Sequence, residues 1–170
     1  MKNLIKKAQQ GDKQAFSQLM QQHMQAMYKT AWAYLGNDED AADVIQETIL
    51  VCYEKLGTLR HPRYFKTWLT RILINKCKDF LKNRSRQTPM ESFAEPSYEE
   101  NGFCDCEWKE ILSCLDEKYR SVLVLYYGQD MRVKEIAALL DINENTVMTR
   151  LSRARQKLRQ EYEGGVIYGR

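Results

Sequence analysis

A cluster of positive charge near the C-terminal end of the sequence is the first feature that could bind a ligand. Residues 145–159 hold five cations and no acid: Arg150, Arg153, Arg155, Lys157 and Arg159. A surface with such one-sided charge attracts a polyanion, and an arginine can also read a base through two parallel hydrogen bonds. The segment therefore predicts contact with nucleic acid. Solvated charge on an ordinary helical hairpin is the alternative.

A second basic stretch, residues 60–86, carries nine cations and a single acid, with aromatic residues interleaved. Phosphate neutralisation combined with flat aromatic faces is the composition that suits single-stranded nucleic acid. The apolar positions, Trp68 among them, are better explained as a buried core. Asn75 matters most among the polar positions, since a carboxamide can read donor and acceptor groups on an exposed base edge. The polar candidates are Lys66, Thr67, Arg71, Asn75, Lys76, Lys78 and Asp79.

The segment between residues 36 and 56 carries the opposite charge. At the spacing of a helix, its apolar residues share one face, and a largely acidic set shares the opposite face. That set consists of Asp43, Gln46, Glu47, Leu50 and Glu54. The acidic face is either solvated or a docking surface for a basic protein, with Leu50 as the apolar anchor inside a charged rim.

The cysteines and histidines offer little chemistry. Cys104, Cys106 and Cys114 lie close together in the sequence, but they lack the paired C-x-x-C spacing and the fourth ligand of a structural zinc site. The sequence contains two histidines, no phosphate-binding glycine loop and no nucleophile motif. We therefore predict no metal, no cofactor and no catalytic residue.

Helices must position these side chains, because the sequence contains no alternating strand pattern and only three prolines. In the C-terminal part, residues 133–140 form one amphipathic helix, the pattern breaks after Asp141, and Asn143 or Asn145 caps a second helix. Two helices joined by so short a turn, the second basic on its free face, predict a helix-turn-helix whose second helix enters a DNA major groove. Asp141 occupies the turn, where a glycine would be easier.

The helical patterns together predict an all-α protein. The charge distribution further divides the chain into two small helical domains joined by a flexible acidic linker. Residues 1–84 hold 14 cations and 8 anions, whereas residues 85–106 hold 1 and 5, together with two of the three prolines. We expect domains at 1–84 and 107–163, a linker at 85–106 and a tail at 164–170, with Gly164 and Gly165 ending the last helix. The lack of a signal-peptide core or a membrane-spanning apolar run predicts a cytoplasmic location without direct membrane insertion.

Three motifs together resemble a known family: DEDAADVIQETIL, then FKTWLTRILINKCKDFLKNR, and after the acidic linker VKEIAALLDINENTVMTRLSRARQKLR. In this order they resemble bacterial RNA polymerase sigma factors of the extracytoplasmic-function (ECF, group 4) subfamily of the sigma-70 family. The resemblance implies that region 2 binds the clamp helices of the polymerase β′ subunit and recognises and melts the minus-10 promoter element. It implies that region 4 reads the minus-35 element and touches the β flap. It also implies an anti-sigma factor, often membrane-anchored, that holds the protein inactive.

The resemblance assigns roles residue by residue. The docking helix for core polymerase contains Asp43, Gln46, Glu47 and Leu50. The minus-10 segment contains Lys66, Thr67, Arg71, Asn75, Lys76 and Asp79. The minus-35 reader contains Lys134, Asn145, Thr146, Thr149, Arg150, Arg153 and Lys157. The sequence departs from the family at Asp141, in place of the usual glycine, and at Met148, where a lysine is common, and both departures bear on which minus-35 sequence is read.

Two other functions fit the basic segments alone. A stand-alone helix-turn-helix regulator would bind promoter DNA without polymerase, and an interaction module would bind RNA or an acidic protein. The acidic face around Asp43 and Glu47 separates these alternatives, because only a sigma factor requires it.

Overall fold

The computed structural model describes residues 1–87 and 106–167 of the 170-residue chain, and within these ranges all regular elements are helical. The predicted all-α class is therefore confirmed. The chain separates into two compact units, residues 1–94 and 95–170. No helix among the described residues is long and apolar enough to cross a membrane. Most of the predicted linker, residues 88–105, lies outside the described residues.

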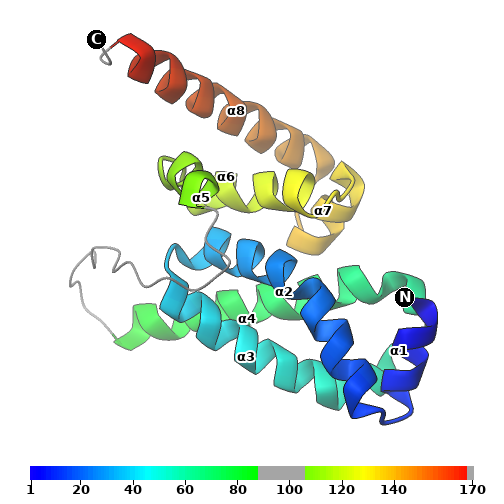
Figure 1. Cartoon of the computed structure of the whole chain (residues 1–170). Coiled ribbons are helices and arrows are strands. Elements are labelled where there is room, and N and C mark those ends of the chain that lie inside the picture. Colours follow the sequence, from blue (N-terminus) through cyan, green and yellow to red (C-terminus); the bar gives the residue numbers. More distant parts are fainter. Residues whose placement is uncertain (88–105, 168–170) are drawn as a thin grey trace. The chain divides into compact units, whose positions relative to one another are not determined.

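The first unit is a helical bundle in which α2, α3 and α4 pack against one another (Figure 1). Its helices are α1 (Lys2–Gln9), α2 (Lys13–Leu35), α3 (Asp38–Lys55) and α4 (Phe65–Gln87), with short 3-10 turns η1 (Leu56–Thr58) and η2 (Pro62–Tyr64) before α4. Leu19, Met27, Val44 and Leu73 are buried between the helices. Burial of these apolar side chains holds the three long helices in fixed positions.

Local signals set where these helices begin and end. Asp12 caps α2, because its Oδ1 accepts a hydrogen bond of 3.0 Å from the amide of Ala15. Gly36 ends α2 with a φ of 77°, a left-handed conformation that glycine adopts without strain. Asn37 then caps α3 through a 2.8 Å bond from the amide of Asp40. The tight connection returns α3 along α2, so the two helices pack as an antiparallel pair.

The second unit contains α5 (Cys106–Ser113), α6 (Glu117–Leu123), a π-helical turn η3 (Val124–Gly128), α7 (Val133–Leu140) and α8 (Glu144–Ile167). α8 packs against both α6 and α7. Val147, Leu151 and Ala154 are buried along α8 and form an apolar stripe at helical spacing, and Leu158 in the same stripe is half-buried. The opposite side of α8 is therefore turned to solvent.

A short turn joins α7 to α8, as the sequence predicts. Asp141 takes the left-handed conformation, with φ 57° and ψ 47°, and the amide of Ile142 donates to the carbonyl of Ala137 at 3.1 Å. Asn143 caps α8, because its Oδ1 accepts from the amide of Thr146 at 2.7 Å. Of the two candidate caps, Asn143 is thus the one used.

The last helix of each unit extends beyond the boundary predicted from the sequence. α4 continues to Gln87, three residues past the predicted boundary at 84. The prediction that Gly164 and Gly165 end the last helix is wrong, because α8 runs through both to Ile167. A glycine inside a helix costs only about 1 kcal/mol relative to alanine, and no proline follows to stop the helix.

Candidate nucleic-acid interface

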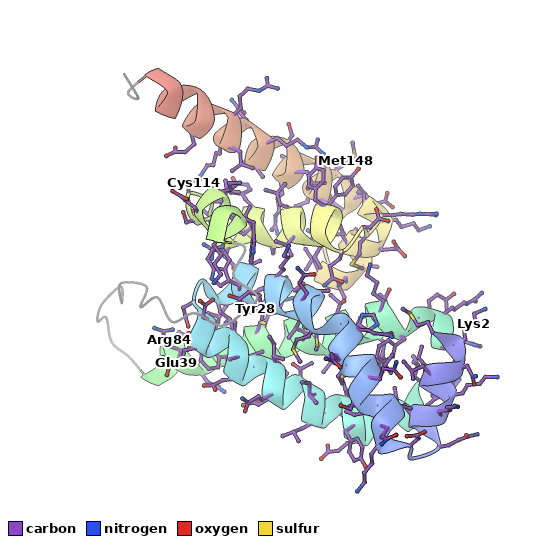
Figure 2. All side chains as sticks on the ribbon, in the orientation of Figure 1. Lys2, Tyr28, Glu39, Arg84, Cys114 and Met148 are labelled. Atoms are coloured by element: carbon purple, nitrogen blue, oxygen red, sulfur yellow. The ribbon has the colours of Figure 1, made fainter. Side chains whose placement is uncertain are left out.

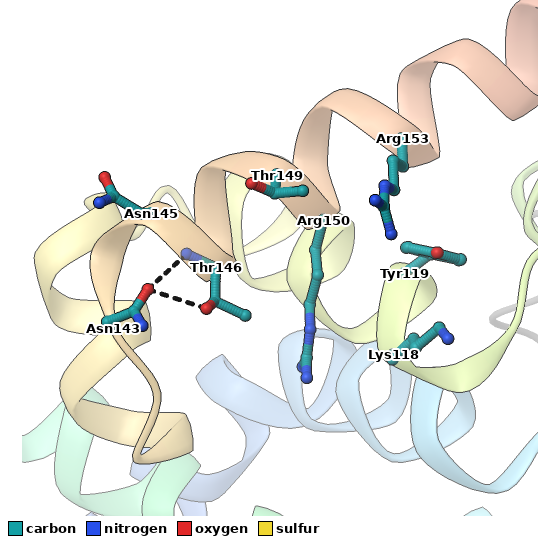
Figure 3. Close-up of a pocket in the computed structure, with 8 residues that line it drawn as sticks. All are labelled: Lys118, Tyr119, Asn143, Asn145, Thr146, Thr149, Arg150 and Arg153. Carbon is teal, nitrogen blue, oxygen red and sulfur yellow. Dashed lines mark hydrogen bonds between the residues drawn. The ribbon is translucent and has the colours of Figure 1, made fainter.

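A polar pocket of about 420 Å³ lies on the second unit, beside the N-terminal half of α8 (Figure 3). Five of the seven predicted minus-35 residues line it: Asn145, Thr146, Thr149, Arg150 and Arg153. The remaining lining residues are Lys118 and Tyr119 of α6 and the cap residue Asn143. The sequence offers no signal for Lys118 or Tyr119, since tertiary packing alone brings α6 beside α8.

The geometry of the pocket follows from the way α8 begins and packs. Asn143 Oδ1 accepts bonds from both the amide and the hydroxyl of Thr146, at 2.7 and 2.8 Å (Figure 3). This fixes the first turn of α8, whose N-terminal amides favour an anionic ligand. Val147 and Leu151 anchor the buried side of the helix, which leaves Arg150 and Arg153 on the side of the pocket.

The pocket has the electrostatics of a polyanion site. Its lining includes the cations Lys118, Arg150 and Arg153 and no acidic residue. Arginine can hold a phosphate or a guanine edge through two hydrogen bonds, and the threonine and asparagine side chains add neutral donors and acceptors. This arrangement can both grip a DNA backbone and read bases.

The other two predicted minus-35 residues lie outside the pocket lining. Lys134 is exposed on α7, and Lys157 pairs with Asp116 at 3.2 Å while lying 5.1 Å from the ring centre of Tyr119. Arg155 lies on another side of α8, where its Nε donates to the Tyr127 hydroxyl at 2.9 Å. The sequence does not indicate this pairing, because the two residues come from different elements, 28 positions apart.

In the first unit, the acidic face of α3 is open to solvent. Asp43, Gln46, Glu47 and Leu50 are all exposed, and Leu50 has 66% of its surface accessible. A leucine so exposed at the centre of a charged rim has the composition of a protein-docking surface. The structure thus brings the four predicted docking residues onto one surface.

The predicted minus-10 residues of α4 fall into two groups. At about 100° per residue, Thr67, Arg71, Asn75 and Asp79 share one side of the helix, and all but the half-buried Thr67 are exposed. Lys66 and Lys76 lie on other sides. Lys76 turns toward α3, where its Nζ lies 3.1 Å from Oε2 of Glu47.

An exposed aromatic residue lies just before α4. Tyr64 is 51% exposed, and the guanidinium of Arg63 lies 4.6 Å from its ring centre. Trp68, one helical turn farther on, is half-buried against Phe65. The exposed ring of Tyr64, with the guanidinium of Arg63 over it, has the composition on which an unstacked base can stack.

The sequence comparisons decide the family. The family model described as Sigma-70 region 2 matches residues 19–87, and that described as Sigma-70, region 4 matches residues 107–158. The RNA polymerase sigma factor SigV of Bacillus subtilis is 32% identical over 141 residues, which cover 81% of this chain and 84% of SigV. The chain belongs to the sigma-70 family of RNA polymerase sigma factors.

Further similarities place this sigma factor in the ECF subfamily. The ECF RNA polymerase sigma factor SigW of Bacillus subtilis is 27% identical over 179 residues, covering 95% of this chain and 96% of SigW. CnrH, solved in complex with the cytosolic domain of CnrY, superposes with a TM-score of 0.69 at 27% identity, over 96% of this chain and 97% of CnrH. RpoE of Bartonella quintana shares the fold, with a TM-score of 0.70 at 23% identity, over 91% of this chain and 98% of RpoE.

Family membership gives the two units their general roles. The chain is an alternative sigma factor, a transcription initiation factor that binds core RNA polymerase and directs initiation at specific promoters. The acidic face of α3 and the cationic helix α4 both lie within the region 2 match, and all eight pocket residues lie within the region 4 match. A stand-alone regulator that binds DNA without polymerase is therefore less well supported than a sigma factor.

The described cysteines of this sigma factor, Cys52, Cys77 and Cys114, belong to no metal-binding cluster. Among the described residues, no group of three or more potential ligands is placed to hold an ion. Cys52 and Cys77 are buried and Cys114 is exposed, and burial raises the pKa of the Cys52 thiol to about 12. Cys104 and the side chain of Cys106 lie outside the described part of the structure.

Proposed function

We propose that this sigma factor divides promoter recognition between its two units, along the boundaries 1–84 and 107–163, with residues 85–106 as the tether. The first unit docks on core polymerase and binds the minus-10 element, and the second reads the minus-35 element. The observation that carries the proposal is the exposed Leu50 within the acidic face of α3, because a sigma factor needs such a surface and a stand-alone regulator does not.

Docking uses Asp43, Gln46, Glu47 and Leu50 against the β′ clamp helices. The carboxylates attract a basic surface and set the register, while burial of Leu50 supplies the apolar contact at the centre. Docking also holds both units on the same polymerase molecule. Once one unit has bound DNA, DNA binding by the other unit is therefore nearly intramolecular.

Minus-10 recognition uses Lys66, Thr67, Arg71, Asn75, Lys76 and Asp79. Asn75 is exposed beside Arg71 on α4, which suits reading an extruded base while a neighbouring cation holds the backbone. Unstacking a base costs a few kcal/mol, and polymerase contacts offset that cost. This step requires no catalytic group, so the chain acts as an initiation factor without enzymatic activity of its own.

Minus-35 recognition uses Lys134, Asn145, Thr146, Thr149, Arg150, Arg153 and Lys157, with α8 in the major groove and the β flap as a further partner of the second unit. The convergence of five of these residues in one pocket supports the assignment. Arg150→Ala or Arg153→Ala should weaken promoter binding by about 1 to 3 kcal/mol if the arginine reads a base bidentately. An equal loss on all DNA sequences would indicate a phosphate contact instead.

Regulation by an anti-sigma factor in the cytoplasm completes the proposal. The similarity to RpoE of Bartonella quintana, solved in complex with the anti-sigma factor NepR, and to CnrH, solved in complex with the cytosolic domain of CnrY, supports such a partner. We expect the partner to cover the polymerase-binding surface. Such a partner could be membrane-anchored while its sigma-binding part lies in the cytoplasm with the polymerase.

Run-off transcription with purified core polymerase tests the proposed docking surface. The double variant Asp43→Lys/Glu47→Lys should abolish promoter-specific transcripts and core binding, because it reverses the charge of the docking rim. Glu110→Lys/Glu161→Lys, at exposed positions on α5 and α8, changes the net charge by the same amount and should retain activity. Unchanged transcription by the double variant, with its helical circular dichroism intact, would refute the docking assignment.

A further inference from the structure

An ion pair joins two residues that the proposed function assigns to different partners. Nζ of Lys76 on α4 lies 3.1 Å from Oε2 of Glu47 on α3. Glu47 belongs to the polymerase-docking face, and Lys76 belongs to the minus-10 segment. While this pair is closed, Glu47 neutralises the ammonium group that would otherwise be available to a phosphate.

A second ion pair in the same bundle shows why the first is exchangeable. Arg84, near the end of α4 (Figure 2), pairs with Asp40 of α3 at 2.7 Å. Asp40 also accepts a hydrogen bond from Asn37 at the start of α3. The side chain of Asp40 is only 19% exposed, so this pair is part of the helix packing. The side chain of Glu47 is 60% exposed, so its carboxylate can meet an incoming cation without unfolding anything.

The position of Lys76 allows it to change partners. The ammonium group of a lysine moves on a flexible four-carbon stem, and Lys76 lies about 60° around the helix axis from Asp79, at the border of the predicted DNA-binding side of α4. Its side chain is 31% exposed, so it is not fixed by burial. Rotation about its side-chain bonds is enough to turn the ammonium group from α3 toward that side.

We propose that Glu47 withholds Lys76 from nucleic acid in the free sigma factor, and that polymerase docking on Glu47 releases Lys76 for a minus-10 phosphate. The inference rests on the proposed docking and minus-10 assignments. A cation of the polymerase replaces Lys76 at Glu47, and a phosphate replaces Glu47 at Lys76, so each charge remains paired. Docking and DNA binding thereby favour each other.

The expected coupling is small but measurable. An exposed ion pair contributes an amount equivalent to about 1.4- to 5-fold in an equilibrium constant. Breaking the pair in the free protein should therefore tighten DNA binding by up to about 5-fold. One additional phosphate contact should also steepen the dependence of log affinity on log salt concentration by about 0.7 for a single strand.

Fluorescence anisotropy of a labelled single-stranded oligonucleotide, titrated with the full chain over a range of KCl concentrations without polymerase, measures both effects. Glu47→Gln should tighten binding and steepen the salt dependence. Glu54→Gln is the matched control, because it removes an equal charge from an exposed position on the same helix. Its effect defines the gain that results from net charge alone.

The same measurement in a Lys76→Gln background decides whether Lys76 carries the effect. There, Glu47→Gln should change affinity no more than Glu54→Gln does. An equal gain from Glu47→Gln with and without Lys76, or a gain no larger than that of the control, would overturn the inference. Core binding by the wild-type chain is measured separately: its failure would overturn the sigma-factor proposal, whereas normal core binding with no effect of Glu47 on DNA affinity would overturn only the release of Lys76.

Discussion

Replacing Asp141 with glycine should stabilise the second unit. Asp141 ends α7 with a φ of 57° and a ψ of 47°. The left-handed conformation costs an L-residue roughly 1–2 kcal/mol, less for aspartate, which can form local hydrogen bonds, and glycine adopts it freely. Because glycine also loses more entropy on folding, we expect a net gain of about 0.5–1 kcal/mol.

Native-state hydrogen exchange of buried amides such as those of Ile136 and Val147 measures this gain within the second unit alone. A gain of about 0.5–1 kcal/mol corresponds to exchange slowed about 2- to 5-fold where exchange follows global opening. Exchange in Asp141→Ala should be faster than in the equally neutral Asp141→Asn, since alanine tolerates the left-handed conformation less well than asparagine.

Charge provides a competing explanation for the same result. A carboxylate at the C-terminal end of α7 opposes the helix dipole, so its removal alone could stabilise the unit by about 0.3–1 kcal/mol. The variant Asp141→Asn separates the two causes, because asparagine tolerates the left-handed conformation and is neutral. Equal stabilisation by Asp141→Asn and Asp141→Gly would assign the gain to charge. Exchange no faster in Asp141→Ala than in the equally neutral Asp141→Asn would refute the strain argument.

Three further predictions concern individual side chains. Asn143→Ala should destabilise the second unit by about 1 kcal/mol, measured by hydrogen exchange, because the amide and hydroxyl of Thr146 lose their acceptor. Burial, and secondarily the charge of Lys66, lower the pKa of His23 in the folded protein. As the pH drops below about 6.5, the histidine of the unfolded chain is protonated before that of the folded chain, so thermal stability should fall. The fall should be smaller in His23→Leu, which has no imidazole to protonate. Iodoacetamide should alkylate exposed Cys114 in the native protein and buried Cys52 only after denaturation, as mass spectrometry of peptides would show.

Features that depend on local spacing could be predicted from the sequence. The burial of Val147 and Leu151, the cap at Asp12 and the turn at Asp141 follow from a helical period and from the chemistry of short polar side chains. The acidic face around Leu50 could be predicted for the same reason, since all its members lie on one helix.

Features that depend on contacts between helices could not be predicted. Lys118 joins the pocket because α6 packs beside α8, and Arg155 meets Tyr127 because η3 directly follows α6 in the chain. The pairing of Lys76 with Glu47 joins positions 29 residues apart and depends on the packing of α3 against α4. A local signal can also mislead, as at the end of α8. Gly164 and Gly165 predict a helix end, but α8 continues through both, because the cost of a glycine is small once a long helix has formed.

The proximity of opposite charges on α3 and α4 bears on why a free sigma factor should bind DNA weakly. The carboxylate-rich face proposed for docking lies beside the cationic helix α4, and Glu47 and Lys76 form an ion pair between them. In the proposed scheme, this pair stays closed until a larger partner binds. The cost of ordering two tethered units on one promoter acts in the same direction. The two effects differ in their response to salt, because screening weakens an exposed ion pair and leaves the ordering cost nearly unchanged. Masking by Glu47 should therefore matter most at low ionic strength, where DNA binding is otherwise strongest.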